Sequence, residues 1–113
     1  MKNIDSYSHV RGESIYLDDI NVLQNTLYAV CFDSTVAHGI IKSLDITEAE
    51  AIEGVVKIIT AKDIKGKNEI GGIIQDEPLL ADHHVHFCGM PMALVVAETE
   101  HIARNALKKI KVA

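Results

Sequence analysis

The clearest hydrophobic pattern in the chain lies between Gly89 and Glu98. A Gly-Met-Pro corner leads into the continuous apolar run 92–97, and an acidic residue ends the run. A short apolar run between turn signals is typical of a strand that is covered on both faces. We therefore expect residues 92–97 to form a buried strand of the core.

The residues after this run change to helical spacing. Thr99 suits a helix start and acidic residues flank it, while Lys108 and Lys109 stand in the expected last turn, so the charges match the helix dipole at both ends. The apolar positions of this stretch fall on one helix face: Ile102, Ala103, Ala106, Leu107 and Ile110. The pattern predicts an amphipathic helix directly after the strand.

Further apolar runs predict an α/β (α+β) fold with a mixed sheet. Strands are expected at 14–19, 27–32 and 55–59, and the run 27–32 is long enough for a central strand. Residues 37–44 have the pattern of a second hairpin arm after 27–32. Residues 83–88 alternate between apolar and polar positions, as a half-buried strand does.

Shorter signals predict the connections between these strands. A capping pattern that begins at Asp45, with a glycine at its end, predicts a helix of at most two turns over 45–54. Residues 60–63 repeat the capping pattern on a single turn. The stretch 65–72 is charged and contains glycine, which favours a loop, and residues 79–81 are expected to pack beneath it.

Composition and charge narrow the class of protein. The chain has 113 residues, 48% of them hydrophobic, with three Tyr, two Phe and no Trp, so one domain with an aliphatic core is expected. The net charge of -5 argues against nucleic acid or an anionic membrane surface as a partner. Without a membrane-length apolar run or a signal-peptide core, a cytoplasmic location is expected, in which Cys31 and Cys88 would be free thiols and Cys31 a small buried hydrophobe.

The two ends of the chain differ from its middle. Residues 1–9 are polar and have no clear period, which favours a flexible arm, and the whole of 1–113 is expected to be a single domain. Lys111 to Ala113 begin an extended segment and then stop. We therefore expect the sequence to be truncated from a longer chain.

One strand carries a possible metal site. His84, His86 and Cys88 alternate on one face of 83–88, and imidazole and thiolate together suit zinc. Three ligands along one straight strand do not make a tetrahedron without a fourth from elsewhere, such as His38 or Cys31. We interpret the stretch as the polar face of an amphipathic strand and keep a metal site as the alternative.

Other polar pairs do not assemble into a catalytic site. Asp18–Asp19 and Asp76–Glu77 are neighbours in sequence, whereas acid/base chemistry needs two carboxylates in different environments, so solvated loop ends are the better interpretation. Gly71–Gly72 lacks the rest of a phosphate-binding motif and is expected to be a turn. We assign no catalytic and no cofactor-binding residue in this sequence.

Taken together, six stretches resemble the a/b hammerhead domain that opens the molybdenum-binding subunit of the xanthine dehydrogenase and aldehyde oxidase family. Ala37–Asp45, for example, is similar to the family pattern A-H-A-x-I-x-x-I-D. In chain order, the six are Arg11–Ile20, Ala37–Asp45, Gly54–Ile64, Asp76–Ala81, Gly89–Glu98 and Ala103–Ala106. The chain departs from the family pattern at Met90, where Gln is common, at Ser14, where Ala is common, and at Lys65, where Pro is common.

The resemblance implies a function for the parent protein rather than for these residues. The family hydroxylates purines, related heterocycles or aldehydes with oxygen taken from water, and we expect a xanthine dehydrogenase-like parent. The molybdenum–molybdopterin cofactor would be bound by domains that follow in the same chain, and [2Fe-2S] clusters and FAD by partner domains or subunits of an oligomer. The implied role of this domain is structural, and the alternatives are a free-standing metal-binding module and an adaptor that dimerises through a strand edge.

Overall fold

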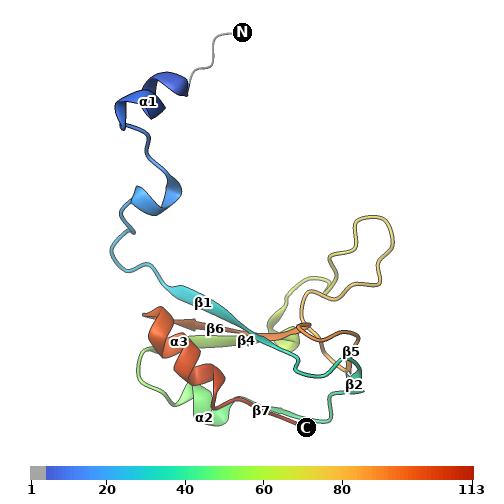
Figure 1. Cartoon of the computed structure of the whole chain (residues 1–113). Helices are drawn as coiled ribbons and strands as arrows, with labels where there is room; N and C mark the ends of the chain where they lie inside the picture. Colours follow the sequence, from blue (N-terminus) through green and yellow to red (C-terminus); the bar gives the residue numbers. More distant parts are fainter. Residues whose placement is uncertain (1–4) are drawn as a thin grey trace.

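The computed structural model, which describes residues 5–113, is built around a three-stranded antiparallel sheet. The strand order is β1 (Tyr28–Asp33), β6 (Pro91–Ala97) and β4 (Val55–Thr60). The central strand, β6, is near the C-terminus and lies between two strands that come earlier in the sequence (Figure 1). The prediction of a strand at 92–97 is confirmed, and this strand is the centre of the fold.

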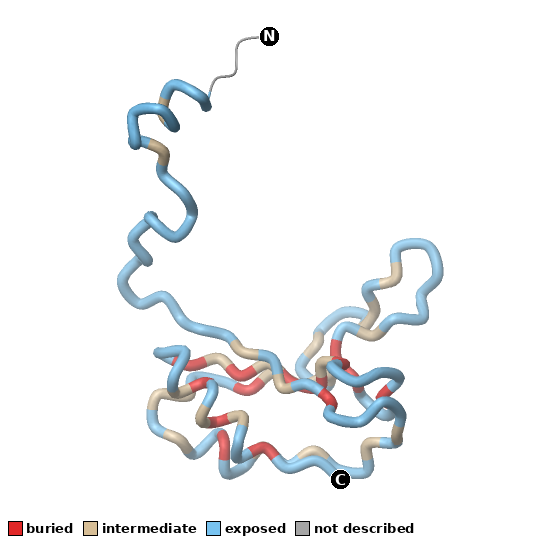
Figure 2. Tube along the Cα trace, in the orientation of Figure 1, coloured by how far each residue is buried: buried red, intermediate tan, exposed pale blue. Residues whose placement is uncertain are grey.

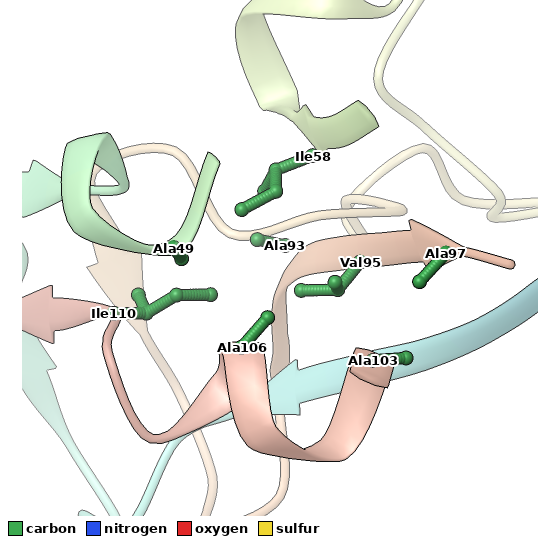
Figure 3. Close-up of a cluster of buried hydrophobic side chains, with 8 residues drawn as sticks. All are labelled: Ala49, Ile58, Ala93, Val95, Ala97, Ala103, Ala106 and Ile110. Atoms are coloured by element: carbon green, nitrogen blue, oxygen red, sulfur yellow. The ribbon is translucent and has the colours of Figure 1, made fainter. Parts of the chain in front are cut away.

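The main core lies between this sheet and the helix α3 (Glu100–Leu107). The alternate β6 residues Ala93, Val95 and Ala97 are fully buried, and so are Ala103 and Ala106 of the helix (Figure 3). These alanines let the helix backbone approach the sheet closely. The Thr99 side chain accepts a hydrogen bond from the Ile102 amide over 3.2 Å, so the predicted helix and its cap are confirmed.

The remaining elements are short. They are α1 (Ser6–Arg11), the 3-10 helices η1 (Leu17–Asp19) and η2 (Ala61–Asp63), α2 (Thr47–Glu50), and the two-residue strands β2 (Gly39–Ile40), β3 (Leu44–Asp45), β5 (His84–Val85) and β7 (Lys111–Val112). Strand β2 pairs with β5, and β3 pairs with β7, both antiparallel. The α/β architecture with few short helices and one longer C-terminal helix is therefore confirmed. The expected mixed sheet is wrong, because every strand pair in the described residues is antiparallel.

A second, smaller hydrophobic cluster lies beside the β2–β5 pair. It consists of Ala81, Val85, Met90 and Met92, all buried. The sulfur of Met90 accepts a hydrogen bond from the His86 amide over 3.4 Å. Met90, one of the positions at which the chain departs from the pattern it resembles, is thus an internal packing residue.

Several predicted elements are wrong in their pairing. Residues 37–44 are not a hairpin arm of β1, because β2 and β3 pair with β5 and β7 instead. β1 pairs only with β6 among the described strands, so it is an edge strand rather than a central one. Cys31 on β1 is accordingly exposed, and not the buried hydrophobe that we expected.

Other elements are shorter than predicted or of another type. Residues 14–19 form no strand: the chain turns into η1 because the Asp19 carboxylate accepts a hydrogen bond from the Tyr16 amide. The helix expected over 45–54 is reduced to α2, and only 84–85 of the expected strand 83–88 pair. By contrast, β4 and the capped turn of η2 are confirmed.

The N-terminus also contains structure that the sequence pattern did not reveal. Helix α1 begins at Ser6, inside the stretch expected to be an arm, whereas residues 1–4 lie outside the described residues. Whether this arm is flexible stays a prediction.

Candidate functional surfaces

Residues 5–27, the N-terminal segment, extend away from the folded body (Figure 1). A compact domain of this length has a radius of gyration of about 13 Å, whereas the Cα atoms here give 19.0 Å. All residues of the segment are exposed except Ser8 and Ser14, which are half-buried (Figure 2). The segment therefore contributes nothing to either buried cluster.

The exposed side chains of this segment include many large apolar ones. Leu17 and Leu23 are each 82% exposed. The other members of the set are Tyr7, Val10, Ile15, Tyr16, Ile20, Val22 and Leu27. So many exposed apolar side chains on one segment are unusual for a protein surface in contact with water.

Local contacts give the segment some order of its own. The Arg11 guanidinium lies 5.0 Å from the centre of the Tyr7 ring, donates to the Tyr7 hydroxyl over 2.7 Å, and pairs with Glu13 over 2.9 Å. The His9 and Tyr16 rings stack with centroids 6.3 Å apart. These contacts shape the segment locally and leave its apolar side chains uncovered.

A second projecting feature is the loop formed by residues 65–80, here named the isoleucine loop (Figure 1). Its apolar residues Ile70, Ile73 and Ile74 are exposed, and Ile73 is 99% exposed. A side chain with so little internal contact costs solvation free energy that burial against another surface would recover.

The base of the isoleucine loop is held by one side chain. The Asn68 amide donates to the Leu80 carbonyl over 2.6 Å, and its oxygen accepts from the Leu80 amide over 2.9 Å. Ile70 and Glu77 close the next rung with a backbone hydrogen bond of 2.8 Å. The sequence analysis missed Asn68, because a lone Asn in a polar loop carries no signal for a contact twelve residues away.

The outer face of the main sheet is only partly covered. Leu94 and Val96 alternate with the core residues of β6 and are half-buried, and Leu94 is paired with Cys31 and with Ile59. The prediction that the β6 run is covered on both faces therefore holds fully for the face of Ala93, Val95 and Ala97. It holds in part for the other face, where Met92 is buried but Leu94 and Val96 are half-buried. The exposed parts of Leu94 and Val96 add to the apolar surface of the N-terminal segment and the isoleucine loop.

The histidine and cysteine candidates separate in space. The register of β2 and β5 pairs Ile40 with His84, which places His38 opposite His86, and the rings of both His38 and His84 lie 6.1 Å from the His86 ring. The thiol of Cys88 instead points to the Ser34 carbonyl, 3.7 Å away. Within residues 5–113, the side chains as placed form no group of three that could hold a metal ion.

Of the four carboxylates in the two predicted pairs, that of Asp19 holds local structure. Asp19 caps η1, and Ile70 donates to the backbone carbonyl of Glu77. Asp18 and Asp76 are exposed. Asp19 and Glu77 are exposed too, which fits the interpretation of both pairs as solvated loop ends.

The cavities of the domain are shallow. One of about 270 Å³ lies between residues 41–46, 60–62 and 81–83 and carries Lys42 and Lys62 on its wall. Its acid–base contact is between chain neighbours, with Asp82 Oδ2 and His83 Nε2 3.2 Å apart. That arrangement offers no nucleophile with a base beside it.

The shifted pKa values also belong to structural contacts. The Thr60 amide, then Lys57, and then the Thr60 hydroxyl hold the pKa of Asp63 down to about 2. The hydrogen bond with Lys111 lowers the pKa of Glu48, and the same contact raises the pKa of Lys111. This ion pair joins α2 to β7 and so ties the last strand to the body.

A protein family matches nearly the whole chain. The a/b hammerhead domain of aldehyde oxidase and xanthine dehydrogenase matches residues 11–113. This chain belongs to that family. The resemblance read from the sequence is confirmed, and the hammerhead domain comprises all the described strands.

Relatives of the hammerhead domain come from both branches of the family. The chain is 40% identical over 101 residues to a xanthine dehydrogenase/oxidase of Gallus gallus and 39% identical over 105 residues to aldehyde oxidase 4 of Mus musculus. These matches cover 89% and 93% of this chain. Since the two identities are nearly equal, they do not discriminate between the branches.

A solved structure has the same fold. An aldehyde oxidoreductase from Desulfovibrio gigas superposes with a TM-score of 0.85 at 36% identity over 97% of this chain. The chain covers only 13% of that protein, and 7% and 8% of the two relatives above. The hammerhead domain is thus a small part of each protein it matches.

No helix among residues 5–113 is long and apolar enough to cross a membrane.

Proposed function

We propose that this hammerhead domain is the N-terminal structural domain of the molybdenum-binding subunit of a xanthine dehydrogenase-like oxidoreductase. The parent protein would hydroxylate purines or related heterocycles with oxygen from water. The observation that supports this role is the apolar surface of the N-terminal segment and the isoleucine loop, which no other part of residues 5–113 covers. These two features would dock on the molybdenum-binding domains of the same protein.

The cofactor of such a parent would be bound outside this domain. A molybdopterin needs a concave site with several converging polar groups, whereas the cavity beside Lys42 is open and its polar side chains belong to chain neighbours or to separate loops. Molybdenum–molybdopterin would therefore be bound by the following domains. [2Fe-2S] clusters and FAD would belong to partner domains or subunits of a cytoplasmic oligomer.

The energetics of burial favour docking. Complete burial of one Ile or Leu side chain contributes about 1.5–3 kcal/mol. Ile73 and Leu17 are almost fully exposed, so each has nearly all of that contribution to gain. Two separate anchors also fix the orientation of the domain, which a single patch would not.

The test is complex formation between this chain and the molybdenum-binding domains encoded with it. We expect a stable complex, and we expect Leu17→Asp and Ile73→Asp each to weaken it at least about tenfold, since each places a charge in an apolar contact. Val56→Asp, which changes an exposed side chain of β4, is the matched control and should leave binding unchanged. Equal binding by all variants would contradict docking through these two features.

A structural adaptor that dimerises through a strand edge is the second candidate. Strands β1 and β4 each have one edge without a partner among the described strands, and such edges can pair with another chain. Sedimentation of the chain alone separates the two roles. A concentration-dependent dimer that excludes the molybdenum-binding domains would favour the adaptor.

A further inference from the structure

We propose that His38, His84 and His86 bind one divalent transition-metal ion, zinc or copper, on the outer face of the β2–β5 pair. The three histidines come from two antiparallel strands rather than from one. His84 and His86 are alternate residues and so share a face, and His38 lies opposite His86 when the β2–β5 register is continued by one residue. His84 and His86 alone lie in a row along one strand. His38 adds a third ligand from the neighbouring strand.

Two of the three ring separations, both from His86, are close to those of a metal site. Two imidazoles bound to one tetrahedral ion have ring centres about 5 Å apart, given metal–nitrogen bonds of about 2.0–2.1 Å. The His38–His86 and His84–His86 ring centres are each 6.1 Å apart. The rings as placed do not form a metal site, but an inward movement of about 1 Å brings them to ligand distance.

The surroundings permit that movement. All three histidines are exposed, so no packed neighbour restrains rotation about their side-chain bonds. The planes of the His84 and His86 rings differ by 24°, and those of His38 and His86 by 53°. Binding requires rotation about the side-chain bonds that aims one nitrogen of each ring at a common point.

The ligand set determines which ion would bind. Three neutral imidazoles suit zinc, copper and nickel, and among divalent ions copper is expected to bind most tightly. With three protein ligands, zinc keeps a fourth position for water. Cys88 is not a ligand, because its thiol points to the Ser34 carbonyl.

The ion would also link two short strands. β2 and β5 share only two residue pairs, so a metal bridge from His38 to His84 and His86 would fix their register. An ion that binds only the folded chain raises the thermal midpoint. This effect gives a readout that does not depend on any enzymatic activity.

The experiment is titration of the untagged 113-residue chain with zinc sulfate and, separately, with copper sulfate, followed by calorimetry and thermal unfolding. We expect one ion per chain and a higher thermal midpoint with metal. His38→Ala, His84→Ala and His86→Ala should each lower the affinity at least about tenfold, since even the loss of a residue that only supports a ligand has that effect. His83→Ala and Cys88→Ala are the matched controls and should bind as the unchanged chain does.

The three histidines are exposed, so each variant is expected to keep the fold. Circular dichroism of each variant without metal would check this. Binding that survives His38→Ala would overturn the two-strand site. Binding that is lost with Cys88→Ala would point back to ligands along one strand. Weak extracellular metal sites bind their ion at about 10⁻⁴ M. If no saturable binding is seen at that concentration of metal, the proposal is overturned altogether.

Discussion

Gly54 joins α2 to β4 with a backbone conformation that side chains disfavour. Its φ angle is +87°, in the left-handed region, and its carbonyl accepts a hydrogen bond from the Glu98 amide over 2.9 Å. A Cβ atom at this position would lie 2.6 Å from Cδ1 of Ile102. The sequence pattern predicted Gly54 as a left-handed stop, and the structure adds the close contact with α3.

We expect Gly54→Ala to lower the free energy of unfolding by about 1–3 kcal/mol, because the left-handed backbone is strained for Ala and the new methyl group displaces Ile102. Chemical denaturation measures this difference. Gly66→Ala is the control, because no atom lies within 4 Å of the added Cβ and its φ is not left-handed. A loss as large for Gly66→Ala would show that the left-handed conformation is not the cause.

At the scale of elements, the isoleucine loop depends on the side chain of Asn68. The two hydrogen bonds between Asn68 and Leu80 replace a rung of backbone pairing at the loop base. Leu80 and Ala81 are buried directly after this rung, as the sequence predicted for the residues beneath the loop, although Leu79 is exposed. The two hydrogen bonds between Asn68 and Leu80 therefore connect the isoleucine loop to the smaller cluster.

We expect Asn68→Ala to speed hydrogen exchange of the Leu80 amide about tenfold, which corresponds to a local loss of about 1.4 kcal/mol, near the value of one or two hydrogen bonds. Exchange followed by NMR gives the rate for each amide. Lys67→Ala, which removes only an exposed hydrogen bond of 3.3 Å to Gln75, should leave the Leu80 rate unchanged. Unchanged exchange in Asn68→Ala would mean that the loop base is held by its backbone alone.

The elements also show what sequence patterns can and cannot determine. β6 and α3 were predictable because apolar spacing, caps and charges all agree over 89–110. The pairing of β1 with β6 was not, because periodicity reports which face of a strand is buried and not which distant strand lies beside it. The same reason applies to the histidine cluster. The sequence predicted that His84 and His86 share a strand face and named His38 and Cys31 as possible further ligands, but only the β2–β5 pairing places His38 opposite His86.

At the scale of the whole molecule, the folded body and the N-terminal segment are separable. Both buried clusters are formed by residues after Tyr28, and the sheet, α3 and the smaller strands all lie within 28–113. The segment before Tyr28 accounts for part of the 57 Å length of the molecule without adding buried surface. Neither buried cluster of the described residues therefore depends on the apolar side chains of this segment.

A chain that begins at Leu27 should accordingly fold with nearly unchanged stability, with a change in the free energy of unfolding below about 1 kcal/mol, because surface removed away from the core contributes little. Its radius of gyration in X-ray scattering should fall from 19.0 Å towards the value of about 12 Å for a compact chain of the remaining length.

As the control, a chain that ends at Glu98 should not fold, because it lacks the buried Ala103 and Ala106 of α3. Equal destabilisation by the two truncations would show that the N-terminal segment packs on the sheet in solution. Docking through Leu17 and its apolar neighbours predicts that the shortened chain folds but no longer binds the molybdenum-binding domains. That result would show that the N-terminal segment is dispensable for the fold and required for assembly.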